Sequence, residues 1–189
     1  MHSASFGRGH TLVELLVVLA ILGIVAQLAL PQMEPASALR ADAAAREVAQ
    51  ALRFAQSEAQ RTGAWYMASC DTAGNSVGIA RVNLKALPPA PDLAAPVLHP
   101  IDKKDYQIVF SSAQSTTGAS IASCAFTYAD GKTVPQLVFG ADGAAVNLTG
   151  PNAPDIKPLT GSSQIVVAAG RVRRAVQVSA PSGRVTIAP

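Results

Sequence analysis

The chain begins with a long apolar run that contains one acid. From Leu12 to Leu30 the residues are apolar apart from Glu14, Gly23 and Gln27. As a helix this run would extend about 28 Å, close to the thickness of the hydrocarbon core of a bilayer. A cleaved secretory signal usually has an apolar part of about 7–15 residues and ends at a pair of small residues. The run therefore predicts a membrane-inserted helix and not an ordinary cleaved signal peptide.

The flank before this run carries Arg8 and no acid, so we expect the start of the chain to stay cytoplasmic and the rest to be exported. Glu14 conflicts with a simple anchor, since an ionised carboxylate at the centre of a bilayer helix costs about 2.5–3.5 kcal/mol. Either Glu14 lies near the interface and reaches water, or a partner compensates its charge.

Residues 9–14 read GHTLVE and lead directly into the apolar run. This pattern closely resembles the type III signal of type IV pilins and type II secretion pseudopilins. The resemblance implies that a prepilin peptidase cuts after Gly9 and that His10 becomes the N-methylated first residue. The family usually has Phe at that position, but cleavage depends mainly on the preceding Gly, so we expect processing.

The same resemblance assigns roles to two further residues. Glu14 would be the fifth mature residue, where the family carries its acid, and would act in assembly. In a packed filament the amino terminus of an adjacent subunit can neutralise a buried carboxylate. Pro31 falls where pilins often carry a proline, which removes a helical hydrogen bond and kinks the helix.

Residues 36–61 contain strong helix formers and no Gly or Pro, and Gly63 follows as a C-terminal stop. Apolar residues recur at steps of three and four, namely Ala41, Ala45, Val48, Leu52, Ala55 and Ala59. This spacing predicts an amphipathic helix whose small packing face lets a sheet or helix approach closely. An Ala-rich surface helix is the alternative.

From Trp65 onward, short apolar runs separated by Gly, Pro, Asn and Asp predict a β-rich domain. The predicted strands are residues 65–69, 77–82, 106–111, 121–128, 136–139, 144–148, 164–168, 171–178 and 184–187. Hairpin turns are expected at residues 141–143 and 169–170. Residues 85–100 hold five prolines, which are excluded from central strands, so we predict a loop there.

Three shorter segments indicate which group of pilins the chain resembles. Residues 55–63 (AQSEAQRTG) resemble the turn out of the long helix in minor pilins of the GspH/FimT family. Residues 137–143 (LVFGADG) and 182–185 (SGRV) resemble the later strands of that family. The resemblance implies a pilin-like α+β fold. A long N-terminal helix, with a hydrophobic stem and an amphipathic half, would pack on an antiparallel β-rich C-terminal domain.

The predicted organisation follows from these segments. Residues 1–9 would form the prepilin leader and residues 10–34 the transmembrane and filament stem. Residues 35–63 would form the amphipathic helix, and residues 64–189 the periplasmic β-rich domain.

Little in the sequence indicates catalysis. Cys70 and Cys124 match no metal-ligand spacing and are either a disulfide or two separate buried thiols. No hydrolase, zinc, phosphate-loop or calcium motif is present, so we expect no metal, no cofactor and no enzymatic activity. In the globular part the only histidine is His99, which we predict to be solvated in the proline-rich loop.

One basic cluster consists of Arg171, Arg173, Arg174 and Arg184. Arg171 and Arg173 would share one face of a strand while Arg174 points to the other. The cluster is either a phosphate-binding patch or a solvated sheet face, and we favour the second. Residues 183–186 read GRVT, whereas DNA-binding minor pilins of the FimT type have Gly-Arg-x-Arg. The net charge of +3 does not by itself indicate nucleic acid.

We therefore expect a minor pseudopilin of the type II secretion system, at or near the tip of a periplasmic pseudopilus, that supports protein secretion. The alternative is a FimT-like type IV minor pilin that binds DNA for natural transformation, and an anchored periplasmic enzyme is a remote third. The expected partners are other pilins or pseudopilins and the prepilin peptidase, with nucleic acid less favoured. The chain would be a single-pass protein of the bacterial inner membrane, with its C-terminal domain in the periplasm.

Overall fold

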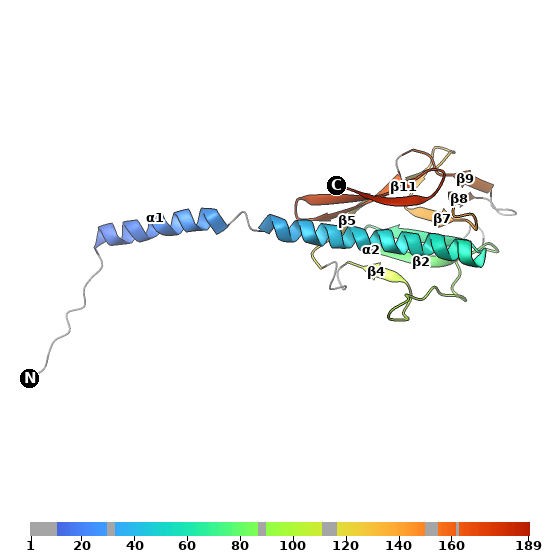
Figure 1. Cartoon of the computed structure of the whole chain (residues 1–189), viewed down its shortest axis with the longest axis horizontal. Coiled ribbons are helices and arrows are strands. Elements are labelled where there is room, and N and C mark those ends of the chain that lie inside the picture. Colours follow the sequence, from blue (N-terminus) through green and yellow to red (C-terminus); the bar gives the residue numbers. More distant parts are fainter. Residues whose placement is uncertain (1–10, 30–32, 87–89, 111–116, 150–154, 162) are drawn as a thin grey trace, which may run out of the picture. The chain divides into compact units, whose positions relative to one another are not determined.

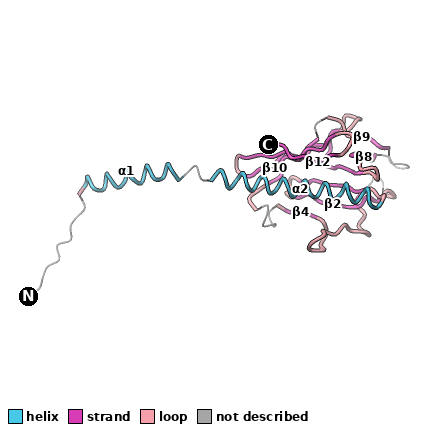
Figure 2. The backbone as a smooth tube through the Cα atoms, viewed as in Figure 1, coloured by secondary structure: helices cyan, strands magenta, loops and turns pink. Residues whose placement is uncertain are grey.

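The structure is a computed structural model that describes residues 11–29, 33–86, 90–110, 117–149, 155–161 and 163–189. The chain divides into two compact units, Met1–Ala36 and Ser37–Pro189. The helices are α1 (Leu12–Ala29) and α2 (Met33–Thr62), and every strand belongs to the second unit (Figures 1 and 2).

Helix α2 starts three residues before the predicted helix and includes Pro35 in its first turn. Proline is tolerated there because the first amides of a helix have no intrahelical partner. The helix ends before Gly63, which has a φ of 67° and donates its amide to Ala59 O at 3.0 Å. Only glycine adopts this left-handed conformation readily, so the predicted C-terminal stop is confirmed.

The predicted packing face of α2 is confirmed, and the alternative of an Ala-rich surface helix is wrong. The buried residues of the helix are Ala41, Ala44, Ala45, Val48, Ala49, Ala51, Leu52, Ala55 and Ala59. Seven of these nine side chains are methyl groups, so the helix axis can lie close to the strands beneath it. Figure 1 shows α2 running alongside the strands of the second unit.

A seven-stranded antiparallel sheet forms one part of the second unit, in the order β3-β2-β1-β7-β8-β9, with β4 also pairing β2. Its strands are β1 (Tyr66–Asp71), β2 (Ser76–Asn83), β3 (Ala90–Pro91), β4 (Gln107–Val109), β7 (Gln136–Phe139), β8 (Ala145–Thr149) and β9 (Asp155–Pro158). The predicted hairpin at residues 141–143 joins β7 to β8.

A five-stranded antiparallel sheet has the order β12-β11-β10-β5-β6. Its strands are β5 (Ser120–Thr127), β6 (Thr133–Val134), β10 (Ser163–Ala169), β11 (Val172–Ser179) and β12 (Arg184–Ala188). The second predicted hairpin joins β10 to β11 through Gly170 and Arg171.

The main core contains the buried face of α2 and residues from both sheets. Its largest fully buried side chains on the strands and loops include Phe110, Phe126, Tyr128 and Phe139. A second, smaller cluster comprises Met67, Val82, Val138, Val146 and Leu148. Met67 alternates with Tyr66 and Ala68 of the main core, so this cluster lies on the other face of the first sheet.

The fold prediction, a long N-terminal helix on an antiparallel β-rich domain, is confirmed. Nine strands were predicted, and all nine are present with ends shifted by a few residues. Strands β3, β6 and β9 were missed. Strand β3 also corrects the prediction that residues 85–100 form only a loop, because Ala90 and Pro91 pair with β2. Its proline is compatible with pairing because β3 is a two-residue edge strand.

Candidate assembly segment and arginine cluster

Thr11 caps the N-terminus of α1. Its Oγ1 accepts a hydrogen bond from Glu14 N at 3.3 Å, and its carbonyl accepts one from Leu15 N at 3.2 Å. A Thr followed three residues later by Glu is the pattern of a capping box, and a carboxylate in the first turn is favoured by the helix dipole. The backbone amide of Glu14 is thus part of the cap at the start of α1.

Every described side chain of α1 from Leu12 to Val25 is exposed within its own unit. The large apolar ones are Leu12, Val13, Leu15, Leu16, Val17, Val18, Leu19, Ile21, Leu22, Ile24 and Val25. A helix that is apolar on all sides requires a surrounding of lipid or protein. Within the described part of the chain, no helix meets the combined length and hydropathy criteria for crossing a membrane.

Three of the predicted site residues lie outside the residues that the structure describes. These are Gly9 and His10 at the predicted cleavage point and Pro31 at the predicted kink. Their roles stay predictions.

At the C-terminal end of α2, a single side chain links the helix to both sheets. Gln56 Nε2 donates to Gly143 O in the β7–β8 turn at 2.8 Å and to Ser182 O in the β11–β12 turn at 3.0 Å. One turn earlier, Arg53 Nη2 donates to Val185 O at 3.0 Å. We call the group of Arg53, Gln56, Gly143, Ser182 and Val185 the Gln56 joint.

The Gln56 joint unites the three short segments that resemble the GspH/FimT family. Gln56 lies in residues 55–63, Gly143 ends residues 137–143, and Ser182 begins residues 182–185. Sequence reasoning did not identify Gln56, because its two acceptors lie 87 and 126 residues further along the chain. The joint positions the end of the helix and the turns of both sheets, and it contains no reactive group.

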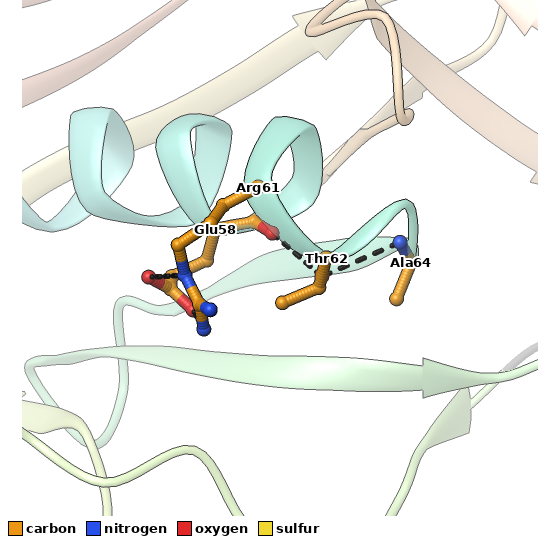
Figure 3. A network of polar contacts seen from close by, with 4 residues as sticks. All are labelled: Glu58, Arg61, Thr62 and Ala64. Atoms are coloured by element: carbon orange, nitrogen blue, oxygen red, sulfur yellow. Dashed lines mark hydrogen bonds and ion pairs between the residues drawn. The ribbon is translucent and has the colours of Figure 1, made fainter.

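The last turn of α2 carries its own polar network (Figure 3). Arg61 donates to both carboxylate oxygens of Glu58, at 2.9 and 2.6 Å, and this bond lowers the pKa of the Glu58 carboxyl. Thr62 Oγ1 donates to Glu58 O at 2.6 Å and accepts from Ala64 N at 3.4 Å. These bonds connect the side chains of the last turn to one another and to the first residues after the helix.

Of the four predicted arginines, Arg171 and Arg173 lie close together. Arg171 is in the β10–β11 turn and Arg173 near the start of β11, and both are exposed. Arg184 pairs with Ser179 at the other end of β11. Six residues of strand separate Arg173 from Ser179, about 20 Å, so Arg184 does not join the other two.

Arg174 lies on the opposite face of β11 and is engaged with α2. Its Nε donates to Asp42 Oδ1 at 2.5 Å, and its Nη1 donates to Arg173 O at 2.9 Å. The Arg174 side chain is therefore occupied in holding the helix to the second sheet.

The structure joins Cys70 of β1 to Cys124 of β5 in a disulfide, with 6.4 Å between the Cα atoms. This is the first of the two arrangements that the sequence left open. Because β1 and β5 belong to different sheets, the disulfide is a covalent link between the sheets.

His99 is half-buried, which corrects the prediction of a solvated residue. Its ring packs at an angle against Tyr106 with 4.7 Å between the ring centroids, and its Nδ1 lies 3.3 Å from Asp102 Oδ1. Burial raises the pKa of the Tyr106 hydroxyl, and the negative charge of Glu47 adds to the rise.

A cavity of about 590 Å³ opens beside His99 and Asp102. The residues around it are Glu47, His99, Asp102, Lys104, Asp105, Gln107, Ile108 and Val109. No group of three or more His, Cys, Asp or Glu side chains suited to a metal occurs in the described ranges.

The N-terminal segment matches a known family motif. The prokaryotic N-terminal methylation motif matches residues 7–26, which include Gly9, His10 and Glu14. The chain thus carries at its N-terminus the methylation motif of type IV pilins.

Two crystal structures of the type IV minor pilin FimU from Pseudomonas aeruginosa strain PAO1 are similar to this chain. The first is 16% identical and has a TM-score of 0.48, with 79% of this chain and 88% of FimU covered. The second is also 16% identical and has a TM-score of 0.42, with 78% of this chain and 92% of FimU covered. No curated protein matches the chain.

Proposed function

We propose that this chain is a non-enzymatic structural subunit of a bacterial envelope filament, assembled through its N-terminal helix. One observation carries the proposal. The N-terminal methylation motif spans residues 7–26 and coincides with a helix whose described large apolar side chains are all exposed.

An exposed apolar helix needs a partner at each stage of such a pathway. Lipid of the inner membrane surrounds it after insertion, and the helices of neighbouring pilin-like subunits surround it after assembly. In this scheme a prepilin peptidase removes residues 1–9, and residues 10–34 form the stem, with Pro31 as its kink. Residues 35–63 continue the helix onto the periplasmic domain, residues 64–189.

Among envelope filaments we favour the pseudopilus of type II secretion, with the chain as a minor subunit at or near its tip. The three GspH/FimT-like segments, which meet in the Gln56 joint, are compatible with this role and with a FimT-like one. DNA uptake is less favoured, because Arg174 is paired with Asp42 and Arg184 lies far from Arg173. A strain without this chain should lose protein secretion and retain DNA uptake. Loss of DNA uptake with normal secretion would instead favour the FimT-like function.

Glu14 provides the test of assembly. Glu14→Ala should leave membrane insertion intact, because it removes a charge from an apolar helix, and should strongly reduce incorporation into filaments. The measurements are membrane fractionation and the amount of the variant in sheared or cross-linked filaments.

Thr11→Ala is the matched control. It removes the Oγ1 acceptor of the helix cap and keeps the Glu14 carboxylate. The assembly role predicts that Thr11→Ala still enters filaments. Normal incorporation of Glu14→Ala would refute the assembly role. An equal loss of incorporation in both variants would mean that Glu14 acts only in the helix cap.

A further inference from the structure

We propose that Arg40, Arg171 and Arg173 form a phosphate-binding surface for the headgroups of anionic phospholipids. We call these three residues the arginine rim. The proposal rests on the proposed membrane location, goes beyond the assembly role, and places its ligand on the second unit alone.

Contacts at the start of α2 bring the three arginines to one end of the second unit. A methyl group added at Gly170, the residue before Arg171, would lie 3.0 Å from Ser37 Oγ. One helical turn further, the Arg40 side chain lies over Gly118, where an added methyl group would be 3.3 Å from Nη1. The β10–β11 turn and the start of α2 are thus in contact.

Strand pairing sets the spacing of the rim. Arg173 is paired with Ala168, and Ala168 is paired with Ser120, two residues after Gly118. Two strand spacings and the two residues from Ser120 back to Gly118, which lies in the turn before β5, place the Cα atoms of Arg173 and Gly118 roughly 12 Å apart. The three side chains therefore surround one end of the sheet and can contact neighbouring headgroups of one surface.

The charge of the rim is not neutralised within the described part of the chain. No ion pair is formed there by Arg40, Arg171 or Arg173, and all three side chains are exposed. At the same end, Asp71 Oδ1 accepts hydrogen bonds from Ala73 N and Gly74 N at 2.9 Å, within its own turn. The acid nearest along the helix, Asp42, is paired with Arg174.

Chain connectivity keeps this end within reach of the membrane segment. Ser37 lies eight residues after Ala29, the last residue of α1, and eight residues span at most about 28 Å in any direction. The rim is thus the part of the second unit that the chain itself tethers to the apolar helix.

The size of the rim favours lipid over nucleic acid. Each arginine close to an anionic membrane strengthens binding roughly fivefold, and a tethered domain needs only a few such contacts. Stable DNA binding typically uses about 6–10 phosphate contacts along an extended surface. Arg184, about 20 Å away, does not extend the rim into such a surface.

The test uses the full chain in lipid nanodiscs made of phosphatidylcholine alone or of phosphatidylcholine with phosphatidylglycerol. Amide hydrogen exchange of residues 168–174 should be slowed severalfold by phosphatidylglycerol, and high salt should reverse the effect. The double variant Arg171→Gln/Arg173→Gln should lose the protection. Arg184→Gln, an exposed arginine of the same sheet, should keep it.

Equal exchange in both kinds of nanodisc would overturn the proposal and leave membrane insertion intact. Failure to enter phosphatidylcholine nanodiscs would instead contradict the proposed membrane location, and the lipid-binding role of the rim would be contradicted as well. A duplex DNA that protects residues 168–174 when phosphatidylglycerol does not would assign the rim to nucleic acid and overturn lipid binding.

Discussion

At the scale of single residues, Gly183 lies where the β11–β12 turn passes the β7–β8 turn too closely for any side chain. An added methyl group would lie 2.5 Å from Gly143 O, a backbone atom, and 2.8 Å from Gln56 Nε2. Gly183 also has a φ of 69°, which other residues rarely adopt. The sequence could mark this glycine as a turn residue, but the approach of the second turn is visible only in the fold.

Gly183→Ala should destabilise the second unit by about 3 kcal/mol, because the left-handed backbone and the contact with a backbone carbonyl both oppose it. Gly131→Ala is the matched control, since Gly131 has a φ of 77° and open space around it. The control should cost about 1 kcal/mol. Thermal unfolding of both variants measures the difference, and equal losses would show that the close approach is absent.

Gln56→Ala should destabilise the second unit by about 2 kcal/mol. It removes two hydrogen bonds at once and leaves the carbonyl groups of Gly143 and Ser182 without this donor. Gln50→Ala, an exposed glutamine of the same helix, should change stability by less than about 0.5 kcal/mol. Similar unfolding midpoints for both variants would mean that the Gln56 joint does not hold the sheets.

At the scale of elements, the sequence pattern predicted those helices and strands whose apolar residues are buried in the core. The three- and four-residue spacing located α2, because one face of the helix is buried. Short apolar runs located strands such as β7, where Leu137, Val138 and Phe139 are all buried, and β10, where burial alternates along the strand. Strand β9 reads Asp-Ile-Lys-Pro and lies at the edge of its sheet, so it has no apolar alternation to reveal it. Two-residue strands such as β6 are too short to produce a pattern.

The disulfide between the two sheets should stabilise the second unit. Removing it with Cys70→Ala/Cys124→Ala should lower the free energy of unfolding by about 2–4 kcal/mol, because the unfolded chain loses a link across 54 residues. Adding reductant should lower the melting temperature of the natural chain to about that of the double variant. A natural chain insensitive to reductant under unfolding conditions would contradict the link.

At the scale of the whole molecule, the features that could be read from sequence are local in the chain. The methylation motif and the apolar run both fall between residues 7 and 30, so their spacing alone carries information. Which arginines lie close together, and which are paired with an acid, could not be read from the sequence. Strand register separates Arg184 from Arg173, and α2 brings Asp42 to Arg174. The rim formed with Arg40 also joins residues more than a hundred positions apart.

We propose that residues 1–9 are a leader and that the chain matures by pilin-type processing. Mass spectrometry of the protein isolated from the membranes of its host tests this most directly. The mature chain should start at His10 and carry an N-terminal methyl group. A chain that keeps Met1, or one cut near Ala29, would contradict it.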